Sequence, residues 1–172
     1  MDWLGTLFLY LHVAGVIVAF GPTIAFPFLA ARAAQEPIHG NFVLRATEFL
    51  TERVVEPIAA FVFLTGVGLI VTRGYNPLTQ LWLALAIILF LVTFAFGNLV
   101  QLRTVRKMVA LTNRPPGESA GAPPETPGSA GASPGGPPPE FVTLSVRAAR
   151  GGQFMGVMLF AILALMVVKP TF

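Results

Sequence analysis

The chain of 172 residues contains no cysteine. Disulfides, thiolate-bound metal ions, iron–sulfur clusters and covalently attached c-type haem are therefore excluded. Charged residues are also scarce, since they make up 11% of the chain against roughly 25% in soluble domains. Because 55% of the residues are hydrophobic, the composition is that of a membrane protein and not of an ordinary soluble domain.

Sequence motifs of common enzyme classes are missing as well. The chain has no HExxH metalloprotease motif, no Walker loop and no nucleophile elbow, and Gly66-Val67-Gly68 is too short for a nucleotide-binding loop. The formal net charge of +3 does not indicate a nucleic-acid partner, because the basic residues flank apolar runs and do not alternate with aromatic ones. The sequence therefore favours a protein that is not an enzyme and binds no nucleic acid.

What the chain does contain is four long apolar runs, at about 3–29, 54–71, 78–102 and 153–168. A helix of about 20 residues crosses the roughly 30 Å hydrocarbon core of a bilayer. The pattern predicts an all-α fold, in which residues 1–172 form one membrane domain built as a bundle of four transmembrane helices. Pro22 and Pro27 are expected to bend the first helix.

Three segments lie between or beside these runs. The amphipathic segment from Phe42 to Val54 is expected either to lie on the membrane surface or to extend the second span. Residues 114–140 are dominated by proline, glycine, alanine and serine, which predicts a disordered linker between the third and fourth spans. The segment from Phe141 to Arg150 is expected to form a short interfacial helix before the fourth span.

The distribution of basic residues predicts the orientation. The connections after the first and third runs hold most of them: Arg32, Arg45, Arg53, Arg103, Arg106, Lys107, Arg114, Arg147 and Arg150. Connections rich in lysine and arginine stay in the cytoplasm. We therefore expect both termini outside and the linker in the cytoplasm, in a cytoplasmic (inner) membrane. Trp3, Tyr10, Tyr75 and Trp82 fall on the outer side, as an aromatic belt would.

His12 is the candidate functional residue, because an ionisable side chain inside a membrane span is costly. It lies about 13 Å below the outer surface, at ~1.5 Å of helix rise per residue. An imidazole there can bind haem iron or another metal, relay protons, or hydrogen-bond to a neighbouring helix. Met158 lies at a similar depth in the fourth run, and histidine with methionine is a known axial pair of haem. Methionine is also an ordinary packing residue.

Two further groups of residues are informative. Glu56, Asn98 and Arg103, together with Gln101, are expected to meet near the cytoplasmic side, either as an entry point for ions or protons or as polar contacts between helices. Small residues recur in the spans and would let helices approach closely: Gly15, Ala19, Gly66, Gly68, Ala95 and Gly97.

Two short segments resemble a known family. Leu11-His12-Val13-Ala14-Gly15 and Met166-Val167-Val168-Lys169-Pro170 are similar to bacterial predicted integral membrane proteins with a domain of unknown function, number 2269. More distantly, the chain resembles HemJ-type protoporphyrinogen oxidases and CopD-like copper-resistance proteins. In the HemJ type, a first-span histidine binds haem b and a Pro-x-Leu element follows, as Pro27-Phe28-Leu29 follows His12 here. Phe28 stands where those oxidases have a basic residue, which argues against oxidase activity.

Three functions remain open at this point. The resemblance implies a protein that holds haem b through His12, for electron transfer or haem handling. The linker and the small residues would also suit an accessory or assembly protein that contacts another membrane protein or a second copy of itself in a homodimer. The predicted cluster of Glu56, Asn98 and Arg103 would suit a small transporter or channel. In each case the lipid bilayer is the immediate partner.

Overall fold

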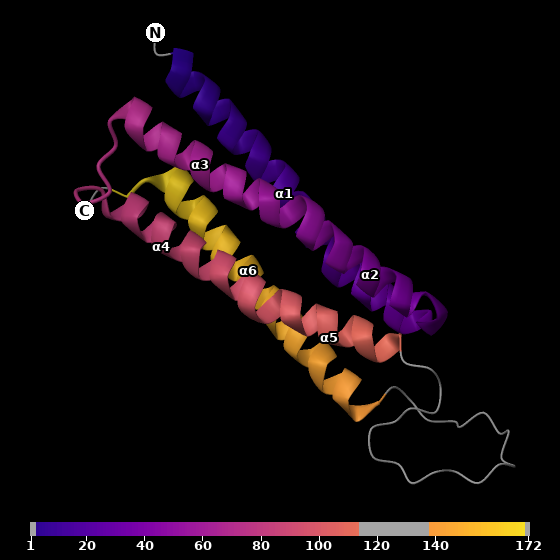
Figure 1. The fold of residues 1–172 in the computed structure, drawn as a ribbon. Coiled ribbons are helices and arrows are strands. Elements are labelled where there is room, and N and C mark those ends of the chain that lie inside the picture. The colour runs from indigo at the N-terminus through magenta and orange to yellow at the C-terminus, as the bar shows by residue number, and fades with distance from the viewer. Residues whose placement is uncertain (1–2, 114–137, 171–172) are drawn as a thin grey trace, which may run out of the picture.

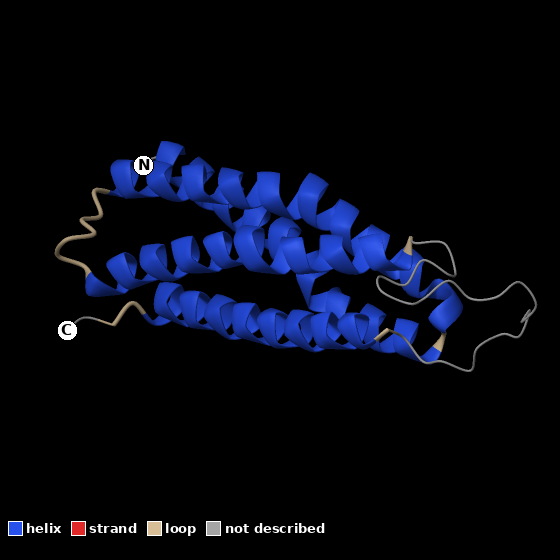
Figure 2. Ribbon diagram, turned by 60° about the horizontal axis from the view of Figure 1, so that its bottom comes forward, coloured by secondary structure: helices blue, strands red, loops and turns tan. Residues whose placement is uncertain are grey.

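A computed structural model describes residues 3–113 and 138–170 of the chain. In chain order, the elements are α1 (Trp3–Gln35), the 3₁₀ turn η1 (Pro37–His39), α2 (Gly40–Leu50), the π-helical turn η2 (Thr51–Val55), α3 (Glu56–Arg73), α4 (Leu81–Phe96), the π-helical turn η3 (Gly97–Gln101), α5 (Leu102–Thr112) and α6 (Pro139–Val168). The described part of the chain contains helices and their connections without a strand (Figure 2). The predicted all-α fold is confirmed.

These elements form four long helices. The backbone continues without a break from α2 through η2 into α3, and from α4 through η3 into α5. The four helices, at Trp3–Gln35, Gly40–Arg73, Leu81–Thr112 and Pro139–Val168, are each long and apolar enough to cross a membrane. They run back and forth along one direction, so that the start of α1 and the end of α6 lie at the same end of the bundle (Figure 1). The predicted four-span bundle is confirmed.

The helices extend further than the apolar runs predict. The segment from Phe42 to Val54 extends the second span, and α1 continues through Pro22 and Pro27. Residues Phe141–Arg150 are not a separate interfacial helix, because α6 begins at Pro139 and continues through Gly151. Its first half packs against α5 and η3, which offsets the cost of about 1 kcal/mol for a glycine inside a helix. Residues 114–137 of the predicted linker lie outside the described residues.

The helices pack mainly in two pairs, α1 with α3 and α4 with α6. The pairs join where α2 meets α5, and a stacked contact between Phe63 and Phe90, with ring centroids 5.9 Å apart, links α3 to α4. At the junction, Arg106 Nη2 lies 2.7 Å from Glu52 Oε1. We call this side of the bundle the charged end: it comprises α2, η2, α5 and the first half of α6, where most of the charged residues lie.

The opposite side, the aromatic end, holds Tyr75, Trp82 and Lys169. Lys169 ends α6 in the left-handed conformation, with φ of 44°. Its Nζ lies 5.7 Å from the ring centroid of Tyr75 and 5.6 Å from that of Trp82. A lysine over two aromatic rings is typical of the membrane–water interface, where amphipathic side chains anchor helices.

Candidate functional site

His12 lies buried between α1 and α3, with 9% of its surface exposed. Its Nδ1 is 3.0 Å from the backbone oxygen of Val62 and 3.2 Å from Thr65 Oγ1. A carbonyl oxygen can only accept a hydrogen bond, so Nδ1 carries the ring proton and donates it to Val62. In the neutral ring this leaves a lone pair on Nε2. The Thr65 hydroxyl lies 3.0 Å from the same Val62 oxygen, to which it also donates.

Small residues on both helices make this contact possible. Gly66 leaves room for the His12 ring, because a Cβ at this position would lie 3.2 Å from His12 Cε1. In the same way, Phe8 packs on Gly68 and Val62 packs on Gly15. We call this interface the α1–α3 seam, formed by Phe8, His12 and Gly15 of α1 and by Val62, Thr65, Gly66 and Gly68 of α3. The predicted close approach of helices at Gly15, Gly66 and Gly68 is confirmed.

The hydrogen bond to Val62 orients the His12 ring in the way that histidines bound to metal ions are oriented. Such histidines usually donate one N–H to a carbonyl or carboxylate, which orients the ring and leaves the other nitrogen for the metal. Among the described residues, no three His, Cys, Asp or Glu side chains lie together as a group that could bind a metal ion. His12 therefore offers a single ligand. That is too few for a free metal ion, but it would be enough to help hold haem, because the porphyrin itself supplies four of the iron's ligands.

Met158, the second predicted haem ligand, lies half-buried on α6. Helix α6 packs chiefly on α4, whereas both hydrogen bonds of the His12 ring go to α3. Helix α6 also contacts α1, but the hydrogen bonds of the His12 ring do not include Met158. The axial pair of His12 and Met158 stays a prediction.

Among the described residues, no hydrogen bond or ion pair joins Glu56, Asn98 and Arg103 to one another. Asn98 Nδ2 donates to the Phe94 oxygen of its own helix at 3.1 Å, and Arg103 is exposed. Glu56 is half-buried at the start of α3. The transporter or channel hypothesis, which is based on this cluster, stays a prediction.

A different arginine connects the two helix pairs at this level. Arg106 donates from Nε to Glu52 Oε1 at 2.8 Å, and the same nitrogen lies 3.9 Å from Glu48 Oε1. The π-helical turn η3 precedes Arg106, and a π turn adds a residue to the helix, which rotates later side chains by about 100°. Counting along a regular α-helix does not include that rotation. Gln101, the fourth residue of the predicted group, binds α6 instead, through Nε2 and the Ala148 oxygen at 2.9 Å.

The fold and the buried histidine define a class, the four-span helical integral membrane proteins with an imidazole at a helix interface. Residues 6–126 match the family described as predicted integral membrane protein, DUF2269, and the chain belongs to that family. The matched residues include the segment around His12. Comparison with curated proteins and with solved structures returned no match.

Proposed function

We propose that this multi-pass membrane protein holds haem b, which His12 would bind through Nε2, and serves in electron transfer or haem handling. The observation that carries the proposal is the hydrogen bond from His12 Nδ1 to the Val62 oxygen at 3.0 Å. It leaves Nε2 as the nitrogen with a free lone pair. Haem b bound there would supply one-electron redox chemistry.

The residues present fit this group as a donor of one ligand. The seam orients the imidazole from one side, through the Val62 oxygen and the glycine at position 66. The residues of α1 from Trp3 to Ala31 include no aspartate, glutamate, lysine or arginine, so the setting of the neutral His12 ring is apolar, as a haem would require. Met158 would be the second residue to hold the haem.

The absorption spectrum of the purified protein tests this proposal. The protein is expressed in cells supplied with haem precursor, extracted in mild detergent and measured in the oxidised and dithionite-reduced states. We expect a Soret band, with about one haem per chain by the pyridine haemochrome assay. A colourless, monodisperse preparation would contradict the proposal and favour an accessory protein with no chemistry of its own.

We further propose that the protein lies in a cytoplasmic (inner) membrane. Its charged end faces the cytoplasm, because this end carries most of the arginine residues. The absence of cysteine allows a clean labelling test. Leu78→Cys places a thiol in the connection between α3 and α4, where Leu78 is 96% exposed, and Ser129→Cys places one in the segment between α5 and α6.

A membrane-impermeant maleimide is expected to label Leu78→Cys in intact spheroplasts, and Ser129→Cys only after the membrane is permeabilised. The cysteine-free parent chain is the background control. Labelling of Ser129→Cys in intact spheroplasts, with Leu78→Cys protected, would contradict the proposed orientation and indicate the opposite one.

A further inference from the structure

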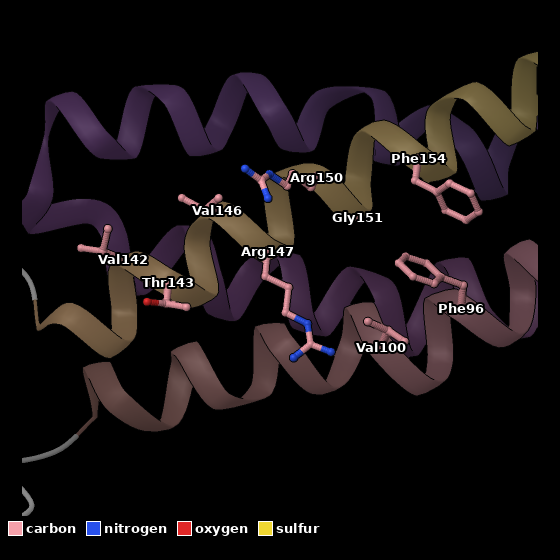
Figure 3. A pocket seen from close by; sticks show the side chains of 9 residues that line it. All are labelled: Phe96, Val100, Val142, Thr143, Val146, Arg147, Arg150, Gly151 and Phe154. Carbon is pink, nitrogen blue, oxygen red and sulfur yellow. The ribbon is translucent and has the colours of Figure 1, made fainter.

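An open groove of about 800 Å³ runs between α6 and the junction of α4 with η3 (Figure 3). Its volume lies in the range of small-molecule sites, about 300–1,000 Å³. The lining consists of five apolar side chains, two arginines, a threonine and a glycine: Phe96, Val100, Val142, Thr143, Val146, Arg147, Arg150, Gly151 and Phe154. This groove is separate from the α1–α3 seam that holds His12.

Specific contacts shape the groove. Phe96 and Phe154 meet edge to face, with ring centroids 5.0 Å apart, and lie at one end of the row of lining residues (Figure 3). Gln101 donates to the Ala148 oxygen at 2.9 Å, next to Gly151, where a Cβ would overlap the Gln101 side chain. The two walls are thus held together at the level of η3, and π-helical turns of this kind are frequent at functional sites.

The charge of the groove is positive. The ion pairs within the described residues involve Arg32, His39 and Arg106, and neither Arg147 nor Arg150 takes part in them. No acidic residue is among the nine that line the groove. Figure 3 shows the Arg147 side chain extending from α6 toward Val100 on the opposite wall. Two arginines that have no acidic partner among residues 3–113 and 138–170, beside an apolar surface, would suit an anionic amphiphile.

The position of the arginines along α6 matches the headgroup region of a bilayer. The 18 residues from 151 to 168 carry no charge and span ~27 Å at ~1.5 Å per residue, close to the ~30 Å hydrocarbon core. Arg147 and Arg150 lie directly beyond this stretch, at the charged end. Phe154 lies inside it, where an acyl chain would run.

We propose that the groove binds one anionic phospholipid of the surrounding leaflet. The phosphate of the lipid lies at Arg147 and Arg150, and one acyl chain packs along Val100, Phe96 and Phe154. Basic pockets between transmembrane helices recognise anionic headgroups in this way. A zwitterionic lipid adds a cation to a groove that offers no acidic partner, so the anionic lipid is preferred.

Native mass spectrometry of the full-length protein in detergent, with added phosphatidylglycerol or phosphatidylcholine, tests the site. The double variant Arg147→Gln/Arg150→Gln is expected to bind phosphatidylglycerol roughly 30-fold more weakly, from about 1 kcal/mol per arginine near the membrane surface. The matched control is Arg45→Gln/Arg53→Gln, which removes the same charge from exposed arginines of α2 and η2, outside the groove. It is expected to bind as the parent does.

Two further variants separate a lipid site from a merely charged surface. Val146→Trp keeps both arginines and fills the groove, and it is expected to weaken phosphatidylglycerol binding at least about tenfold. Inorganic phosphate at millimolar concentration is expected not to displace the lipid, because it leaves the apolar wall empty.

Equal binding by the groove and control double variants would overturn the proposal, and so would unchanged binding by Val146→Trp or displacement by inorganic phosphate. Val146→Cys tests a second copy of the chain as the occupant. A disulfide-linked dimer of this variant in native membranes would also overturn the proposal, whereas a monomer is the expected result. None of these results depends on whether the protein holds haem.

Discussion

Substituting His12 by alanine is expected to abolish the Soret band of protein purified from haem-supplied cells. The reason is that His12 is the residue proposed to hold the haem and that its Nε2 carries the lone pair left by the Nδ1 bond to Val62. Removing the ring removes that ligand, so haem content by the pyridine haemochrome assay is expected to fall to background. The measurement compares variant and parent at equal protein concentration, after size-exclusion chromatography in the same detergent.

Two companion variants distinguish a lost ligand from a damaged fold. His12→Asn keeps an N–H that can donate to the Val62 oxygen but offers no imidazole lone pair, and we expect a folded protein without haem. His39→Ala removes the other histidine, which is exposed in η1, and we expect full haem content. A His12→Asn protein with an unchanged Soret band would show that haem, if present, is bound elsewhere.

Gly68→Ala is expected to lower the free energy of unfolding by about 1–3 kcal/mol, the usual cost of overfilling a packed interface. The added Cβ would lie 2.5 Å from Phe8 Cε1 and 2.6 Å from Phe8 Cδ1. An aromatic ring cannot bend away as a flexible chain can, so α1 and α3 must separate or the ring must leave the seam. The measurement is unfolding by sodium dodecyl sulfate in mixed micelles, followed by circular dichroism.

Gly156→Ala is the matched control, because a Cβ at Gly156 on α6 would meet no atom within 4 Å. That variant is expected to be neutral or more stable by up to about 1 kcal/mol, since alanine is the better helix residue. Combining Gly68→Ala with Phe8→Ala should make the glycine substitution nearly harmless, because the clashing ring is gone. Equal stability of Gly68→Ala and Gly156→Ala would contradict the close packing of the seam.

The fold could be predicted from the sequence because apolar runs long enough to span a bilayer leave few alternatives. The helix lengths could not. The amphipathic parts, α2 and α5, pack on each other at the charged end, and so the helices continue past the apolar runs. Hydropathy alone detects only the portion of a helix that faces lipid.

The sequence predicts His12 as the candidate functional residue, but it does not predict the groups that surround it. His12 stands out as a buried ionisable group, but its main partner is the backbone oxygen of Val62, and a backbone atom leaves no mark in a sequence. Thr65 could have been identified from its depth in the membrane, in the same way as Met158. It lies eight residues before Arg73 at the end of α3, or ~12 Å deep at ~1.5 Å per residue, close to the depth of His12.

The polar contacts at the charged end illustrate a different limit. The sequence indicates which helices could exchange charge, yet the pair that forms uses Arg106 with Glu52 and not Arg103 with Glu56. The two π-helical turns, η2 and η3, lie in the helices that carry these residues. Each π-helical turn changes the face of the helix on which later side chains project, and no residue pattern in the sequence predicts either turn.

The proton position on the His12 ring tests the central claim most directly. The chain has two histidines, so ¹⁵N-histidine labelling of the His39→Ala variant leaves His12 as the single labelled ring. In haem-free protein in lipid bilayers, solid-state NMR is expected to show the proton bonded to Nδ1 and an unprotonated Nε2. A proton on Nε2, with Nδ1 unprotonated, would contradict donation to Val62 and would remove the ligand on which the proposed function rests.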